Sequence, residues 1–242
     1  MFVLMKTKSL LHILPAVVFA GQVSSAQDSQ EPEHGRVGKV LFVLTSHAKL
    51  GETDQATGYH LSEVSHPYQV VVDAGFEVDF ASPMGSKPPV DGLNLDDPVN
   101  ATFWNDPSIQ KKLNNTQTIA SVNSADYDAI YFAGGHGTMW DFPSNPNIGK
   151  VTAAIYEAGG VVAAVCHGLA ALVDVKLSDG TYLVAGKEIS VFTNEEEIAV
   201  QKENIVPFLL ADRLVEQGAK HMPVNNFKKQ VVVSFLGSVP AI

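Results

Sequence analysis

The stretch from Gly159 to Gly168 constrains the fold most, because it joins a buried strand to a reactive side chain. Val161–Val165 is an unbroken run of small and β-branched residues, which is typical of a strand covered on both faces of a parallel sheet. The run ends at Cys166, the single cysteine of the chain, and His167 follows it. Ligands and catalytic groups gather at the carboxyl ends of strands in open α/β sheets. We therefore expect a sharp turn from strand into helix that presents the thiol at this edge.

The N-terminal segment has the pattern of a secretory signal peptide. Two lysines precede an apolar run from Leu10 to Ala20, and a series of small residues ends at Ala26; this order is typical of cleaved signals. A membrane anchor is the alternative, but the run is short for a bilayer span and contains a proline. We expect residues 1–26 to be removed and residues 27–38 to form a flexible lead-in. The protein would then be exported, to the periplasm or out of the cell.

Charge and cysteine content narrow the class of protein further. The 242-residue chain has a net charge of −10, and loss of the basic signal segment makes it more acidic still. An acidic chain without a basic cluster is a poor binder of nucleic acid or of anionic membranes. One cysteine cannot form an internal disulfide, although export favours disulfides. The thiol is therefore either a small buried apolar group or a reactive one, and its place at a strand end favours the second.

Strands and helices alternate along the rest of the chain. Strands are expected at residues 39–45, 77–81, 129–133, 161–165 and 231–233, and helices at residues 57–74, 147–158 and 207–217. Residues 83–124 are interpreted as an insertion with two short helices, and residues 177–191 as a hairpin. The alternation predicts one α/β domain over residues 39–242, with a doubly wound, mostly parallel sheet flanked by helices.

Cys166 is the candidate nucleophile. The thiolate is the reactive form of cysteine, and a helix N-terminus or a neighbouring cation lowers its pKa. The predicted turn supplies the helix end, and His167 is adjacent in sequence. A small buried residue that ends a strand is the structural alternative. The preceding glycines, the histidine and the following glycine favour covalent chemistry.

A glycine cluster, Gly134-Gly135-His136-Gly137, follows the neighbouring predicted strand. Glycines let backbone approach a ligand closely, and free N–H groups there can receive an oxyanion. A tight turn needs the same residues, so the cluster is informative chiefly because it adjoins the cysteine strand. Its spacing fits neither a dinucleotide-binding fingerprint nor a P-loop. We expect no nucleotide and no other cofactor.

Glu63 lies in a predicted helix that contains Pro67. Proline has no N–H group, so the carbonyl of Glu63 loses its helical donor and the helix is irregular at this point. An acid on a face with Tyr59, Val64 and Tyr68 can be partly buried, with a raised pKa suited to proton transfer. An ordinary solvated acid is the alternative interpretation.

Metal binding is a further interpretation of the same helix. His60, Glu63 and His66 follow one another at offsets of three residues, which brings side chains together on a helix. Pro67 disturbs the geometry that a metal site would need. We therefore expect no metal at these residues.

Three consecutive acids, Glu195-Glu196-Glu197, follow Thr193-Asn194. Thr193 or Asn194 can cap a helix whose first turn favours acidic residues, which accounts for at least two of the three. One of the acids can instead orient His167 and complete a Cys–His–acid arrangement.

Four segments together resemble the ThiJ/PfpI superfamily, whose flavodoxin-like fold is similar to class I glutamine amidotransferase domains. The segments are TGYHLSEVSHP, AGGHGTMWDFP, AVCHG and FTNEEE, and the branch resembled contains heat-shock chaperones and glutathione-independent glyoxalases. The resemblance implies a triad of Cys166, His167 and Glu197, with Glu196 as the acid if the register shifts by one. It also implies that Glu63 hydrogen-bonds the thiol, and that the backbone N–H groups of Gly135 and His167 form an oxyanion hole.

The chain departs from the superfamily at two places. Leu169 stands where many relatives have proline after Cys-His-Gly. After the strand at residues 231–233, the relatives continue through a Gly-Gln-Asn-Pro segment and a final helix, whereas this chain continues as SFLGSVPAI. We expect the C-terminal strand and helix to be altered or missing.

The resemblance implies an enzyme that converts methylglyoxal or a similar small 2-oxoaldehyde to lactate without glutathione or any cofactor. A stress-protective chaperone or protein deglycase, with a redox-sensing cysteine and client proteins as partners, is one alternative. A cysteine amidohydrolase or amidotransferase-like protein is another, and an inactive paralogue is a third. If the protein is an oligomer, a homodimer is the expected form.

Overall fold

The computed structural model describes residues 2–6, 37–223 and 231–235. Its strands are β1 Phe2–Lys6, β2 Lys39–Val43, β3 Tyr59–His60, β4 Glu77–Ser82, β5 Val90–Asp91, β6 Gln117–Thr118, β7 Ala129–Phe132, β8 Val161–Val165, β9 Glu188–Ile189, β10 Lys220–His221 and β11 Val231–Phe235. Its α-helices are α1 Ser62–Asp73, α2 Pro98–Asn105, α3 Pro107–Leu113, α4 Thr138–Asp141, α5 Pro146–Glu157, α6 Asn194–Ala199 and α7 Leu210–Glu216. The 3-10 helices are η1 Ile119–Ser121, η2 Ser124–Asp126 and η3 Cys166–Leu172.

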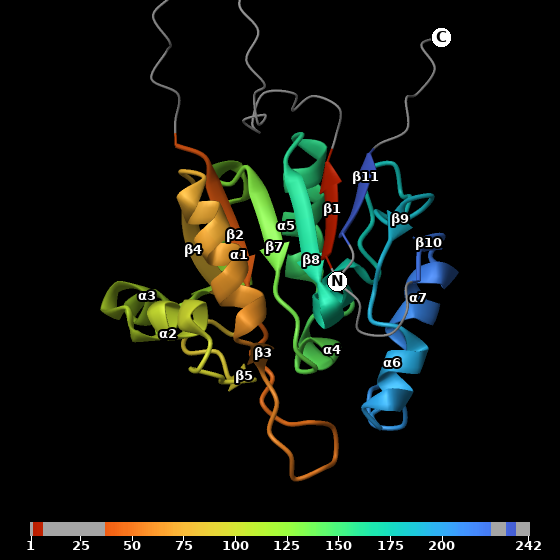
Figure 1. Ribbon diagram of the computed structural model, residues 1–242. Helices are drawn as coiled ribbons and strands as arrows, with labels where there is room; N and C mark the ends of the chain where they lie inside the picture. Colours follow the sequence, from red (N-terminus) through yellow and green to blue (C-terminus); the bar gives the residue numbers. More distant parts are fainter. Residues whose placement is uncertain (1, 7–36, 224–230, 236–242) are drawn as a thin grey trace, which may run out of the picture.

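A seven-stranded sheet forms the centre of the molecule, in the order β11-β1-β8-β7-β2-β4-β6. From β8 to β6 every neighbouring pair is parallel, while β1 is antiparallel to β8 and parallel to β11. Helix α1 lies in front of the sheet and α5 behind it, and the carboxyl ends of the parallel strands point downwards (Figure 1). The predicted α/β fold, with a mostly parallel sheet flanked by helices, is confirmed.

Each face of the sheet carries its own apolar core. Leu41, Ile130 and Phe132 belong to the cluster that contains residues of α5 and η3. Phe42 and Tyr131, each one residue along the same strands, belong to the cluster with residues of α1, α2 and α3. This alternation follows from the two-residue period of a strand. Because helices cover both faces, neighbouring strand residues are buried on opposite sides, which explains the continuous apolar runs in the sequence.

The five predicted strands all form, but two other predictions need correction. The helix expected from residue 57 begins at Ser62, because Tyr59–His60 pairs with Val90–Asp91 as a short strand instead. The hairpin expected over residues 177–191 forms only in its first part. The chain does turn there, with a bridge between Lys176 and Tyr182, but β9 then pairs in parallel with the distant β10. Tertiary pairing outweighed the local turn pattern at this place.

The N-terminal residues differ from expectation, because Phe2–Lys6 forms a strand between β8 and β11. The sequence predicts that these residues lie outside the fold. Their run Phe-Val-Leu-Met is rich in residues that suit a strand, which accounts for the pairing. Cleavage of a signal peptide stays a prediction, and the lead-in falls largely outside the described residues.

The C-terminal strand is present, as β11, at the edge of the sheet. The place of the final helix of the superfamily lies beyond residue 235, outside the described residues. Within the described part of the chain, the helices are all too short or too polar to cross a bilayer.

Two glycines give a matched test of the packing. A methyl group on Gly149, in α5, would meet no atom within 4 Å, whereas one on Gly160 would lie 2.7 Å from Ile155 Cγ2 and 2.8 Å from the carbonyl oxygen of Asp128. We expect Gly149→Ala to stabilise the protein by about 0.5–1 kcal/mol, because alanine is the better helix former. Gly160→Ala should destabilise it. Urea unfolding measures both; equal effects would contradict the packing described here.

Candidate active site

Cys166 occupies a strained turn at the carboxyl end of β8. Its φ is +52°, in the left-handed region that side chains other than glycine rarely adopt. The 3-10 helix η3 begins at the same residue. Gly168 then passes so close to β7 that a Cβ there would lie 2.4 Å from the carbonyl oxygen of Phe132. The close packing after the turn holds the strained residue and directs its thiol away from the strand.

His167 faces the thiol with one ring nitrogen and a carboxylate with the other. Cys166 Sγ lies 3.4 Å from His167 Nδ1, and His167 Nε2 lies 2.8 Å from Glu197 Oε2. The histidine is fully buried, and burial lowers its pKa to about 4 despite the hydrogen bond to Glu197. The ring is therefore neutral at pH 7. Because an ionised carboxylate only accepts, Nε2 carries the proton and the lone pair of Nδ1 faces the sulfur.

Glu197, rather than Glu196, reaches the histidine because a capping box fixes the start of α6. Thr193 Oγ1 accepts a hydrogen bond from the Glu196 N–H, and Glu196 Oε2 accepts one from the Thr193 N–H. The Glu196 carboxylate is therefore engaged by the Thr193 N–H at the start of the helix. The side chain of Glu197, the next residue, reaches His167 instead. Burial opposes ionisation of Glu197, but hydrogen bonds from His136 and His167 outweigh it and lower its pKa to about 2.

His136 is the functional residue that sequence reasoning missed. Its Nε2 lies 3.0 Å from Glu197 Oε1, so the two carboxylate oxygens each accept from a different histidine. The rings of His136 and His167 are 4.1 Å apart, and Phe192 lies 4.3 Å from the ring of His167. In the sequence, only the glycines around His136 were given a role. A histidine at a neighbouring strand end was the available signal.

Glu63 lies on the other side of the thiol, in the first turn of α1. Its carboxyl group interacts with the Cys166 thiol and with the backbone of Gly134, and both interactions lower its pKa. A Cβ on Gly134 would lie 2.4 Å from Glu63 Oε2 and 2.9 Å from Cys166 Cβ, so only glycine leaves room for this contact. Oε2 is buried with no hydrogen-bond partner among the described residues.

Burial favours the protonated forms of both the Cys166 thiol and the Glu63 carboxyl group. Burial raises the pKa of Glu63. Burial also raises the pKa of the Cys166 thiol well above its usual value, and the charge of Glu63 raises it further. Two adjacent anions in this environment are unfavourable, so the pair retains a proton near neutral pH. Cys166 as a whole residue is partly exposed.

The two backbone groups predicted to form an oxyanion hole follow neighbouring strands, His167 in the turn after β8 and Gly135 after β7. The backbone of His167 interacts with the Cys166 sulfur and lowers the pKa of the thiol. Gly135 has a φ of +104° and packs so tightly on β3 and the residue before it that a Cβ would lie 2.2 Å from the carbonyl oxygen of Gly58. Among the described residues, no acceptor is found for the Gly135 N–H. The role of both groups as an oxyanion hole stays a prediction.

The residues weighed for a metal site in the sequence do not come together as one. His66 Nε2 is paired with Asp97 Oδ2 at 2.9 Å, while Glu63 faces the thiol. His136, His167 and Glu197 are the described group whose potential ligand atoms lie within 4.8 Å of one another. In the structure these atoms are already joined by hydrogen bonds.

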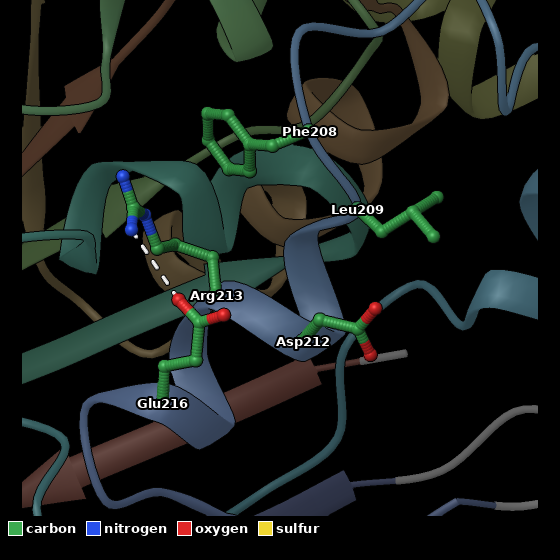
Figure 2. Close-up of a pocket in the computed structure, with 5 residues that line it drawn as sticks. All are labelled: Phe208, Leu209, Asp212, Arg213 and Glu216. Atoms are coloured by element: carbon green, nitrogen blue, oxygen red, sulfur yellow. Dashed lines mark hydrogen bonds and ion pairs between the residues drawn. The ribbon is translucent and has the colours of Figure 1, made fainter.

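A separate hollow lies on α7, lined by Phe208, Leu209, Asp212, Arg213 and Glu216 (Figure 2). Arg213 pairs with Glu216 at 3.3 Å and lies over the ring of Phe208, while Asp212 accepts from Asn194. Its charged side chains already have protein partners, and it contains none of the residues around Cys166. It is therefore a poor candidate for catalysis.

Comparison with known proteins places the chain in a family. Residues 55–215 match the DJ-1/PfpI family, and the chain belongs to it. It is 37% identical over 179 residues to the glutathione-independent glyoxalase HSP31 of Saccharomyces cerevisiae, which covers 69% of this chain and 74% of the yeast protein. It is 33% identical over 171 residues to Glyoxalase 3 of Candida albicans, over 64% of this chain and 69% of that protein.

Solved structures agree with this assignment. The 24 kDa Rapid Encystment Protein of Francisella tularensis has a TM-score of 0.78 and 39% identity, over 82% of this chain and 92% of that one. The structure of glyoxalase III from Candida albicans has a TM-score of 0.70 and 26% identity, over 82% of this chain and 90% of that one. The resemblance to the ThiJ/PfpI superfamily is thus confirmed.

The buried histidine predicts a dependence of stability on pH. Between pH 6.5 and about 4 the unfolded chain protonates this imidazole, whereas the folded protein keeps it neutral, so acid favours the unfolded state. We expect His167→Gln to remove this contribution. Between pH 6.5 and 5 the unfolding free energy of the variant should fall by about 1–2 kcal/mol less than that of the wild type. Parallel urea-unfolding profiles over this range would contradict a buried neutral histidine.

Proposed function

We propose that the chain is a glutathione-independent glyoxalase that converts methylglyoxal, or a similar small 2-oxoaldehyde, to lactate. The observation that carries the proposal is a single thiol held between two proton-handling groups, His167–Glu197 on one side and Glu63 on the other. Two relatives named as glyoxalases support the proposal, and the match to this chain covers 74% of one and 69% of the other.

The reaction begins with addition of the Cys166 sulfur to the aldehyde carbon. The thiol proton passes to His167 Nδ1, whose lone pair faces the sulfur, and Glu197 stabilises the imidazolium that forms. The carbonyl oxygen becomes an oxyanion and is received by backbone N–H groups of Gly135 and His167. Protonation of this oxyanion gives a hemithioacetal.

A proton then moves between two substrate carbons. Glu63 acts in its carboxylate form, which its raised pKa makes a stronger base, and removes the proton from the former aldehyde carbon to give an enediolate. Return of a proton to the adjacent carbon yields a lactyl thioester. Water cleaves the C–S bond, which releases lactate and restores the thiol. Substrate and water together account for every atom of the product, so no external oxidant, reductant or glutathione is consumed.

The structure does not test three further expectations from the sequence. Export of the protein, binding of client proteins and formation of a homodimer all stay predictions.

Lactate formation tests the proposal directly. The purified full chain, given methylglyoxal without glutathione, should produce lactate, and stereospecific assays identify the D or L form. Cys166→Ala should lower turnover by about 10³-fold or more, because the covalent step is lost. A cooperative thermal melt shows that each sample is folded. Folded wild-type protein that makes no lactate, or a Cys166→Ala variant with full turnover, contradicts the proposal.

Two neighbouring acids give a matched test of the catalytic register. Glu197→Gln removes the charge that orients and stabilises His167, and kcat should fall on the order of 10²-fold or more. Glu196→Gln changes the same chemistry one residue away, at the capping box, and kcat should stay within about threefold of the wild type, since only the helix cap is weakened. The reverse order of effects would assign the acid to Glu196.

A further inference from the structure

Helix α1 contains a proline that leaves the backbone of the catalytic glutamate without its helical partner. Pro67 lies inside the helix, four residues after Glu63. Proline has no N–H group, so it cannot donate to the carbonyl of the residue four positions earlier. A buried carbonyl without a donor is costly. Something outside the helix must satisfy Glu63, or this turn of α1 is free to shift.

Tyr131 supplies the missing donor from the sheet. Its hydroxyl donates to the carbonyl oxygen of Glu63 at 2.5 Å. The tyrosine belongs to β7 and is 3% exposed, and its ring packs 4.6 Å from that of Phe42 on the neighbouring strand. A donor fixed in the core in this way has little freedom to move, so it fixes the carbonyl as well.

The end of the same strand also lies against the glutamate side chain. Gly134, three residues after Tyr131, is so close to the Glu63 carboxyl group that a Cβ on it would lie 2.4 Å from Oε2. Glu63 thus contacts this strand at two points: its carbonyl accepts from Tyr131, and its carboxyl group lies against Gly134 just after β7. Burial raises the pKa of Tyr131 well above its usual value, and the charges of Glu63 and Cys166 raise it further. The hydroxyl therefore remains a donor throughout the working pH range.

We propose that Tyr131 is a positioning residue, whose hydroxyl replaces the donor that Pro67 lacks and so holds the Glu63 carboxyl group against the Cys166 thiol. The inference rests on the proposed function for the task it gives Glu63 in turnover. The titration of the thiol, however, can be measured without that reaction.

Alkylation of the thiol by iodoacetamide across pH is the first readout. Cys166 is the single cysteine of the chain, so the alkylation rate reports on it alone. Tyr131→Phe removes the hydroxyl and keeps the ring. Because Glu63 and Cys166 titrate as a pair, loosening Glu63 should displace the midpoint of the profile by about half a pH unit or more. With methylglyoxal, kcat should fall about tenfold while KM stays close to the wild-type value.

Tyr156 provides the matched control. It is 1% exposed, and its hydroxyl has no hydrogen-bond partner among the described residues. Tyr156→Phe therefore removes a buried hydroxyl that makes no hydrogen bond to the described residues. It should leave the alkylation profile unchanged. An equal displacement in Tyr131→Phe and Tyr156→Phe would show a general effect on the core and would overturn the inference.

Restoring the helical donor provides the decisive comparison. Pro67→Ala returns an N–H group four residues after Glu63, which can satisfy the carbonyl without Tyr131. In that background Tyr131→Phe should displace the profile by less than half as much as it does alone, since the two donors are redundant. An undiminished effect, or a Tyr131→Phe profile that overlays the wild type, overturns the inference. If the wild type makes no lactate, the proposed function fails, but the alkylation comparison still decides the role of Tyr131.

Discussion

The site depends on one backbone constraint, the positive φ of Cys166 where β8 ends. A strained residue persists only where its surroundings leave it no alternative. Here the preceding strand is fixed in the sheet by parallel pairing with β7, and the following residues are pressed against that same strand at Gly168. The thiol consequently leaves the sheet at its carboxyl edge, near Glu63 in the first turn of α1 and beside His167, which Glu197 of α6 contacts. The packing of β8 and Gly168 against β7 therefore determines the position of the thiol.

Charge is distributed unequally on the two sides of the sulfur. On one side, two histidines donate to a single carboxylate, which keeps Glu197 ionised and His167 oriented. On the other side, burial favours the protonated form of Glu63. One carboxyl group thus serves as a fixed anion and the other as a group that can exchange its proton. Differences of environment of this kind assign separate roles to chemically similar residues.

The sequence was sufficient to predict the parallel strands and the thiol at a strand end, because continuous apolar runs and glycines have local causes. It failed where distant segments decide the outcome. β9 pairs with β10 rather than folding back as a hairpin, and Phe2–Lys6 joins the sheet although its composition suits a signal segment. His136 and Tyr131 were missed for the same reason. Each acts on a residue more than sixty positions away, and no pattern around either residue names its partner. For Glu63, by contrast, Pro67 indicated that the backbone carbonyl lacks its helical donor. The sequence did not identify the Tyr131 hydroxyl as the group that replaces it.

The central claim is that the Cys166 thiol, held at this turn, attacks the substrate covalently. The most direct test is rapid acid quenching of the protein during turnover of methylglyoxal, followed by mass spectrometry of its peptides. The account predicts that the peptide with Cys166 gains the mass of one methylglyoxal during turnover and returns to its original mass when substrate is exhausted. Turnover without any such adduct, or an adduct that stays on other residues while Cys166 remains unmodified, would contradict it.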